Sequence, residues 1–151
     1  MKTTFLAAVG DANDIRTWSG IPLHELQEGR RQGVIDAGLP LNAEGWSWTA
    51  RRYGWNLGSL LRGHGRGGYQ YSVSFLERLW APCRRDVQGA RIVNCFQLYP
   101  PSLVADGSVE LWFHLDQTLL QLFDAYGVRD TIGQRIAADG LERERAGYER
   151  A

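Results

Sequence analysis

The segment that most constrains the fold is the opening of the chain, up to Gly33. An apolar run over residues 4–9 ends at Gly10, a polar loop covers residues 12–19, and Pro22 starts a helical pattern that ends near Gly33. Proline is favoured in a first helical turn because the N–H that it lacks has no partner there, and glycine favours a helix C-terminus. Strand, loop and helix in this order form the opening unit of a doubly wound α/β fold. Such folds bind ligands beyond the carboxyl ends of their strands, where a helix N-terminus favours a phosphate.

The rest of the chain alternates between strand and helix patterns. Further strands are predicted over residues 34–41, 91–98 and 109–115, and helices over residues 46–62, 70–85, 116–126 and 130–150. We expect the apolar runs 5–9, 92–98 and 110–115 to be strands of one mainly parallel sheet. At 151 residues, the chain is expected to form a single Rossmann-like α/β domain over residues 1–151.

The composition excludes several classes of function. Hydrophobic residues make up 44% of the chain, and 17 basic residues balance 17 acidic ones, so the strong positive charge typical of nucleic-acid-binding proteins is absent. The two cysteines, Cys83 and Cys95, lie in apolar patterns and are expected to be reduced core thiols. No zinc-ligand spacing is present, and we expect neither a metal nor a cofactor. The N-terminal apolar run is too short for a signal peptide or a membrane span, which predicts a cytoplasmic protein.

Two glycine-containing segments are candidates for ligand contact. Gly10 and Gly20 flank the first loop, where they either let the backbone approach a ligand or serve as ordinary turn residues. The G-x-G-x-x-G pattern of dinucleotide-binding proteins is absent, which disfavours NAD. Residues 63–68 (GHGRGG) follow a helical pattern instead of a strand and lack the Gly-Lys-Ser/Thr of a phosphate-binding loop. We interpret them as a flexible connector.

Polar residues also follow a later strand. His114 and Asp116 lie at the carboxyl end of the run over 109–115, where doubly wound enzymes place catalytic groups. They are two residues apart, so on a regular strand their side chains point the same way. Asp116 is equally well placed as the N-cap of the next helix, in which case it has no further role. Residues 142–145 (ERER) are interpreted as a solvated helix face.

Three stretches are similar to one family of enzymes. Residues 10–22, GDANDIRTWSGIP, resemble the segment after the first strand of glycosyltransferases with the GT-B fold, of the retaining family 4 type, which carry a "WSG-x-P" stretch there. Residues 116–127, DQTLLQLFDAYG, resemble the "D-x-T" segment after a later strand of that family, and residues 142–151 resemble the helix before its next strand. The resemblance covers most of the chain and is weakest between residues 44 and 86.

The resemblance implies a two-lobed enzyme that moves a sugar from a nucleoside-diphosphate sugar to an acceptor hydroxyl. This chain would be its N-terminal, acceptor-side lobe, incomplete and truncated before the C-terminal lobe that holds the donor. Asp116 is the implied catalytic residue, which would position or polarise the acceptor hydroxyl, and the helix N-terminus at Gly20 would help to stabilise the leaving diphosphate. The candidate substrate-binding residues are Gly10, Asp11, Asp14, Arg16, Trp18, Ser19, Gly20 and His114.

Two other classes of function remain open. The chain is alternatively a nucleotide- or phosphate-binding module without chemistry, or an interaction subunit that docks onto a separate C-terminal lobe. As a lobe, it is expected to transfer no sugar alone, because half a cleft cannot hold donor and acceptor together. We also expect self-association or a partner lobe, because a sheet that lacks its last strands exposes unpaired N–H and C=O groups.

Overall fold

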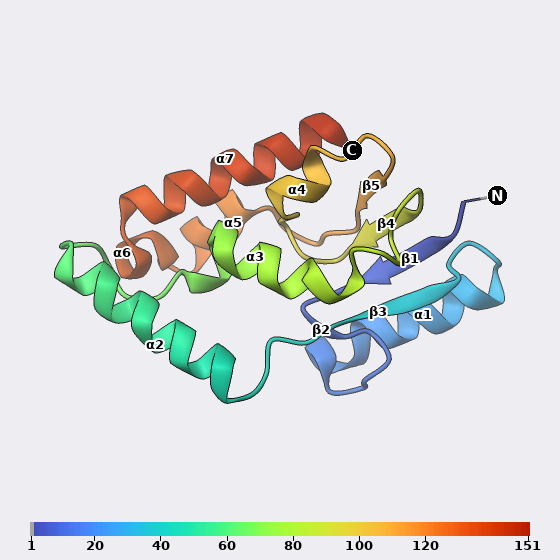
Figure 1. The fold of residues 1–151 in the computed structure, drawn as a ribbon, viewed down its shortest axis with the longest axis horizontal. Coiled ribbons are helices and arrows are strands. Elements are labelled where there is room, and N and C mark those ends of the chain that lie inside the picture. Colours follow the sequence, from blue (N-terminus) through green and yellow to red (C-terminus); the bar gives the residue numbers. More distant parts are fainter. Residues whose placement is uncertain (1) are drawn as a thin grey trace.

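A computed structural model describes residues 2–151, which form a five-stranded sheet in the order β2-β3-β1-β4-β5 (Figure 1). Three of the four strand pairings are parallel, and β2 pairs antiparallel with β3. The predicted α/β fold with a mainly parallel sheet is therefore confirmed, and it is Rossmann-like in its arrangement. The strands are β1 (Thr4–Ala7), β2 (Gly10–Asp11), β3 (Ala37–Leu41), β4 (Arg91–Asn94) and β5 (Glu110–Phe113).

The three apolar runs expected to share one sheet do so. Leu6 of β1 is level with Val93 of β4, which is level with Trp112 of β5. Each strand ends before its apolar run does, and the last residues of the run belong to the turn that follows the strand. After β4, for example, the Asn94 side-chain amide donates to the Leu98 carbonyl oxygen at 3.0 Å and closes a turn.

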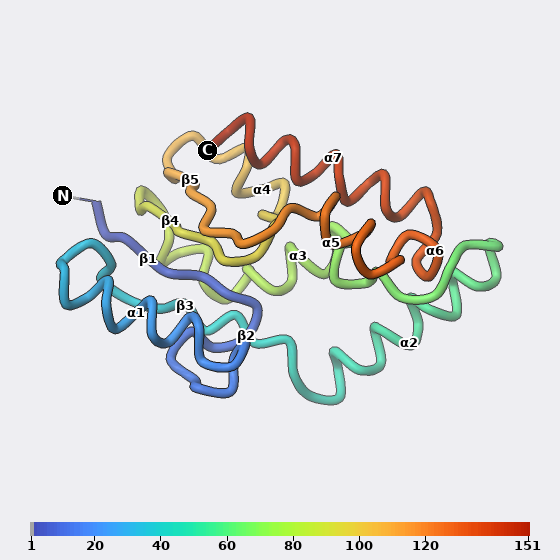
Figure 2. The backbone as a smooth tube through the Cα atoms, turned by 180° about the vertical axis from the view of Figure 1, so that it is seen from behind, coloured from blue at the N-terminus to red at the C-terminus, as the bar shows by residue number. Residues whose placement is uncertain are grey.

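Helices cover the two faces of the sheet unequally (Figures 1 and 2). The helix α1 (Ile21–Arg31) packs on one face, where Leu26 joins Leu6 and Cys95 in a small core. The larger core lies on the other face, and α2 (Trp46–Leu61) extends along one end of the molecule. The helices of the larger core are α3 (Val73–Trp80), α4 (Pro101–Val104), α5 (Leu119–Ala125), α6 (Val128–Ile132) and α7 (Gln134–Arg150), with 3₁₀ segments η2 (Tyr69–Tyr71) and η3 (Ala81–Cys83).

Three predicted helices have other bounds in the structure, and the one predicted over 70–85 is reduced to α3 between two 3₁₀ segments. The helix expected to open at Asp116 begins at Leu119, and Thr118 is its N-cap. The Thr118 hydroxyl accepts from the Gln121 N–H at 3.2 Å, and the Gln121 side chain accepts from the Thr118 N–H at 2.9 Å. Asp116 could not form this reciprocal capping box, because a leucine stands three residues after it. The last predicted helix is divided into α6 and α7 by Gly133, whose φ of 85° no helix accommodates.

Two segments expected to be loosely held are packed. A Cβ added to Gly65 would lie 2.3 Å from the Thr131 carbonyl oxygen, so the loop over residues 63–68 lies directly against the α6–α7 junction. The interpretation of residues 142–145 as a solvated face is wrong for Glu144, which is only 4% exposed. Its carboxylate accepts from the Leu119 N–H at 2.7 Å and so satisfies an otherwise unpaired N–H in the first turn of α5.

Candidate functional site

The loop that follows β1 is ordered by its own carboxylates. The Asp11 side chain accepts from the backbone and side-chain N–H groups of Asn13, at 2.8 and 2.9 Å. Asp14 accepts from the Arg16 backbone N–H at 2.9 Å and from two guanidinium nitrogens, with a shortest N···O distance of 2.6 Å. These hydrogen bonds from Arg16 hold the pKa of Asp14 at about 2. The loop is therefore a pair of successive Asx-type turns that offer fixed acceptor oxygens.

The same loop ends in three successive residues in the left-handed region. Trp18 has φ 47°, Ser19 has φ 57° and Gly20 has φ 83° within η1 (Thr17–Gly20). A left-handed conformation costs about 1–2 kcal/mol for each residue that carries a Cβ. Backbone strain of this kind persists only where surrounding structure imposes it, and it is common at ligand-binding sites.

The two glycines that flank the loop are required by the loop itself. A Cβ on Gly10 would lie 2.8 Å from two side-chain atoms of Thr17, and one on Gly20 would lie 2.6 Å from the Ile15 side chain. Both glycines also have positive φ. Of the two interpretations left open above, turn formation explains both residues without a ligand.

A hollow of about 310 Å³ lies at the carboxyl ends of β1 and β3. Five of the predicted substrate-binding residues line it together: Gly10, Asp11, Asp14, Arg16 and Trp18. Asn42 and Glu44, which follow β3, complete the wall and were not identified from the sequence. The rule that ligands bind beyond strand carboxyl ends could have found them, since both come within three residues of the end of a strand.

The charge of this hollow does not favour a phosphate. It contains the carboxylates of Asp11, Asp14 and Glu44 against one guanidinium, which is already engaged by Asp14. The N-terminus of α1 adds little, because Pro22 has no N–H and the Ile21 N–H donates to the Trp18 carbonyl oxygen within the preceding turn. The expected anion-binding helix N-terminus therefore has few free donors, next to a surplus of negative charge.

His114 and Asp116 lie outside this hollow. Both follow β5, which is separated from β1 by β4, whereas the hollow lies on the β3 side of β1. The His114 imidazole Nε2 lies 2.8 Å from a carboxylate oxygen of Glu25 on α1. Asp116 is exposed in the bend before Thr118. The first loop and the later strand end thus share an edge of the sheet but not a pocket.

Glu25 also contacts a buried thiol, but the three groups do not form a nucleophilic site. The Cys95 Sγ lies 3.4 Å from the second carboxylate oxygen of Glu25 and is 5% exposed. Burial and the adjacent carboxylate raise the pKa of Cys95 far above its ordinary range, which suppresses the reactive thiolate. The free, buried state of Cys83 and Cys95 confirms that they are core thiols.

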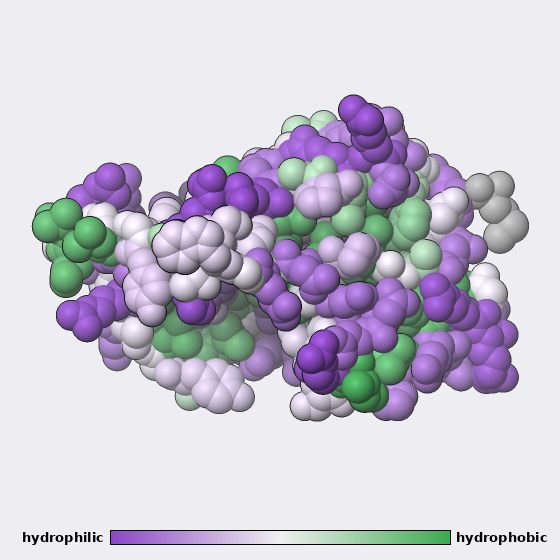
Figure 3. All heavy atoms as spheres, turned by 60° about the horizontal axis from the view of Figure 1, so that its bottom comes forward, coloured by the Kyte–Doolittle hydropathy of each residue, from purple (hydrophilic) through white to green (hydrophobic). Residues whose placement is uncertain are grey.

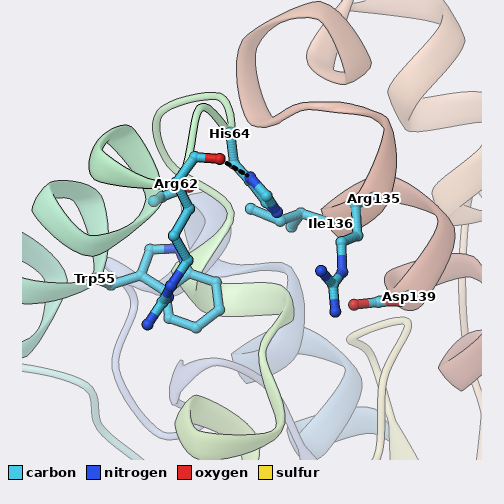
Figure 4. A pocket seen from close by; sticks show the side chains of 7 residues that line it. Trp55, Arg62, His64, Arg135, Ile136 and Asp139 are labelled. Carbon is cyan, nitrogen blue, oxygen red and sulfur yellow. Dashed lines mark hydrogen bonds between the residues drawn. The ribbon is translucent and has the colours of Figure 1, made fainter.

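A second hollow, of about 280 Å³, lies between α2 and α7 (Figure 4). Three basic side chains border it. Arg62 follows the last residue of α2, His64 belongs to the loop after it, and Arg135 lies in the first turn of α7. The Trp55 indole lines its wall, and Asp139 is its only acidic residue. The sequence patterns predict only a connector for the 63–68 loop, which contains His64, and do not single out Arg62 or Arg135. Residues 62 and 135 are brought together only when this loop docks on α7.

Within residues 2–151, no group of three or more His, Cys, Asp or Glu side chains is placed to hold a metal ion. None of the helices described there has the length and apolar character needed to cross a membrane.

Comparison with known proteins gives no relative from which a function could be transferred. No protein-family model matches the chain, and no curated protein or solved structure gives a significant match.

Proposed function

We propose that this chain is the acceptor-side lobe of a sugar-transferring enzyme, and that the hollow beyond β1 and β3 binds hydroxyl groups of a saccharide acceptor. The observation that carries this proposal is the lining of the hollow: three carboxylates, an amide side chain and the 40% exposed indole of Trp18. Carboxylates and amides accept hydrogen bonds from hydroxyl groups. An indole adds a flat apolar surface, against which the C–H face of a sugar ring can pack.

Charge favours a neutral polyol over the donor's diphosphate at this position. A diphosphate would meet the carboxylates of Asp11, Asp14 and Glu44, while Arg16 is held in its bidentate pair. A hydroxyl group has no such repulsion and donates the protons that these carboxylates lack. The resemblance of residues 10–22 to family 4 glycosyltransferases supports the acceptor-side lobe, but the diphosphate site that it implies at Gly20 has few free N–H donors. Because Asp116 lies outside the hollow on the β5 side, this proposal requires the reacting hydroxyl to belong to a part of the acceptor that extends out of the hollow along the sheet edge. The chain alone transfers no sugar because its hollow has no group for the diphosphate.

The test is chemical-shift mapping of the isotope-labelled chain with a panel of neutral mono- and disaccharides and, separately, with uridine diphosphate. Saccharides should shift amide signals of residues 11–19 and 42–44. Trp18→Ala and Glu44→Gln should abolish the shifts, whereas Glu142→Gln, an exposed carboxylate on α7, should not. Shifts at these residues from uridine diphosphate but from no saccharide would contradict the proposal.

The basic hollow between α2 and α7 supports a second candidate function, the binding of a phosphate-bearing ligand. Arg62, His64 and Arg135 face this hollow with one opposing carboxylate, which gives it the positive charge that the first hollow lacks (Figure 4). Uridine diphosphate and inorganic phosphate should then shift amides near residues 62–66 and 133–136, and Arg62→Gln with Arg135→Gln should remove the effect. Since the two hollows share no residue, the same titrations distinguish the two functions.

A further inference from the structure

Helix α2 carries an outward stripe of large apolar side chains. Successive residues of an α-helix are about 100° apart, which places positions 46, 53, 57, 60 and 61 on one side of α2. The side chains there are strongly exposed: Trp46 82%, Tyr53 67%, Leu57 61%, Leu60 49% and Leu61 79%. Figure 3 shows green and pale side chains gathered over this helix, at the left of the view. We call these five residues the α2 stripe.

The opposite side of α2 already accounts for its attachment to the protein. Trp48 packs edge-on against Phe75 with ring centroids 5.4 Å apart, and Trp55 packs on Tyr69 at 5.8 Å. The buried Ser59 donates to the Gly65 carbonyl oxygen at 2.7 Å. The α2 stripe is therefore not needed to hold the helix in place, and a contiguous exposed apolar surface of this kind marks an interaction site.

The segment that carries the α2 stripe contains charges of one sign, although Glu44 and Asp139 border the hollows beside α2. Residues 46–76 contain four arginines, Arg51, Arg52, Arg62 and Arg66, and no Asp or Glu. The remaining residues carry thirteen basic and seventeen acidic side chains, so this segment is a positive end on an otherwise negative molecule. By helical geometry, Arg51 and Arg52 leave α2 on opposite flanks of the α2 stripe.

From the α2 stripe and its arginines, we infer that α2 docks this protein onto an anionic lipid surface. An amphipathic helix with Trp, Tyr and Leu on one side and only basic charges beside them lies in the plane of a bilayer interface. Its aromatic side chains suit the headgroup level, and its arginines suit anionic headgroups. At 16 residues, α2 offers a contact about 24 Å long that lies on the surface without spanning it.

The same charges argue against a second copy of α2 as the occupant. Two α2 stripes packed face to face would bring together Arg51 and Arg52 of both copies, four arginines with no acidic residue in either segment. Like charges at such an interface oppose association. An anionic bilayer has the opposite sign and covers the whole length of the stripe.

The experiment is co-flotation of the purified chain with vesicles made of equal parts phosphatidylglycerol and phosphatidylcholine, compared with vesicles of phosphatidylcholine alone. We expect binding to the anionic vesicles only, and a decrease in binding as salt is raised. Leu57→Ser should weaken binding several-fold and the double variant Leu57→Ser/Leu61→Ser at least tenfold. Arg51→Gln/Arg52→Gln should weaken it about 25-fold, since each arginine near an anionic surface contributes roughly fivefold.

Matched control variants test whether vesicle binding depends on the α2 stripe or on any exposed apolar or basic side chain. Val34→Ser changes an apolar side chain that is 58% exposed, close to the 61% of Leu57, but lies between α1 and β3. Arg85→Gln removes an exposed arginine outside the segment. Both should bind as the unaltered chain does, and circular dichroism should show every variant folded.

Three outcomes would overturn the inference. One is the absence of flotation with anionic vesicles. Another is equal loss of binding in the Val34→Ser control. The third is that the chain forms a concentration-dependent dimer, which the Leu57→Ser substitution dissociates, and does not bind vesicles. That result would assign the α2 stripe to a protein–protein contact.

Discussion

Gly65 gives the sharpest test of how the loop after α2 packs against the α6–α7 junction. A Cβ at this position would lie 2.3 Å from the Thr131 carbonyl oxygen, 2.5 Å from the Ile132 carbonyl carbon and 2.6 Å from the Gly133 nitrogen. Ordinary contacts begin at 3.4 Å, so the loop and the α6–α7 junction must separate by about 1 Å. All three atoms belong to the backbone, which leaves no side chain free to rotate away. Gly65 does not have a positive φ, so its substitution tests packing alone.

We therefore expect Gly65→Ala to destabilise the protein by about 3 kcal/mol, the upper end of the usual range for overpacking. For a domain of this size, the melting temperature should fall by about 6–12 °C. Calorimetry or circular dichroism on heating would measure it. The matched control is Gly54→Ala in α2, where no heavy atom lies within 4 Å of the added Cβ. That variant should gain about 1 kcal/mol from better helix propensity.

The two alanine substitutions should thus shift the melting temperature in opposite directions. A Gly65→Ala variant at least as stable as the unaltered chain would refute the reasoning. The loop would then not be packed against α7, and the basic hollow that depends on this contact would not exist in the form described.

Three further predictions concern capping, burial and pH. Thr118→Ala should cost about 1 kcal/mol of unfolding free energy, while Asp116→Ala should leave stability unchanged in the same urea titration, because Thr118 and not Asp116 caps α5. Glu144→Ala should cost about 1–3 kcal/mol because it leaves a buried N–H of α5 unpaired, and Glu144→Gln, which keeps the acceptor oxygen, should cost much less. The Asp14–Arg16 pair depresses the pKa of Asp14 from 3.8 to about 2, so its stabilisation of the first loop is complete above pH 3.8 and is lost as pH falls through about 2. Amide shifts of the loop should follow that transition, and Asp14→Asn should abolish it.

Local sequence signals predicted the parts of the fold that depend on neighbouring residues. Apolar runs over 5–9, 92–98 and 110–115 identified three strands, and Pro22 and Gly33 bounded α1 closely. The burial of apolar side chains along a strand and the restricted or unusual backbone dihedral angles of proline and glycine depend on only a few neighbouring residues. Their effects can therefore be predicted from the sequence. The capping error at Asp116 shows the limit of a single-residue rule, because the cap depends on a reciprocal partner three positions on.

The sequence predicted where the candidate site lies but not which kind of ligand its chemistry favours. The strand-loop-helix opening located Gly10, Asp11, Asp14, Arg16 and Trp18 in one loop, and the structure gathers them around one hollow. Their chemistry was not determined, because the expectation of a phosphate rested on the helix N-terminus alone. Only the tertiary structure adds Asn42 and Glu44, which follow β3, and Glu44 gives the hollow a third carboxylate beside Asp11 and Asp14.

The acidic hollow beyond β1 and β3 and the basic segment over 46–76 both show where local sequence patterns stop being sufficient. The sequence by itself determined a balanced chain with an apolar core, a parallel sheet and a positively charged segment over 46–76. Only the tertiary structure decided that Trp48 and Trp55 face inward while Trp46 and Leu61 face solvent. An amphipathic pattern shows which side chains share a face, but the packing of distant elements decides which face is covered.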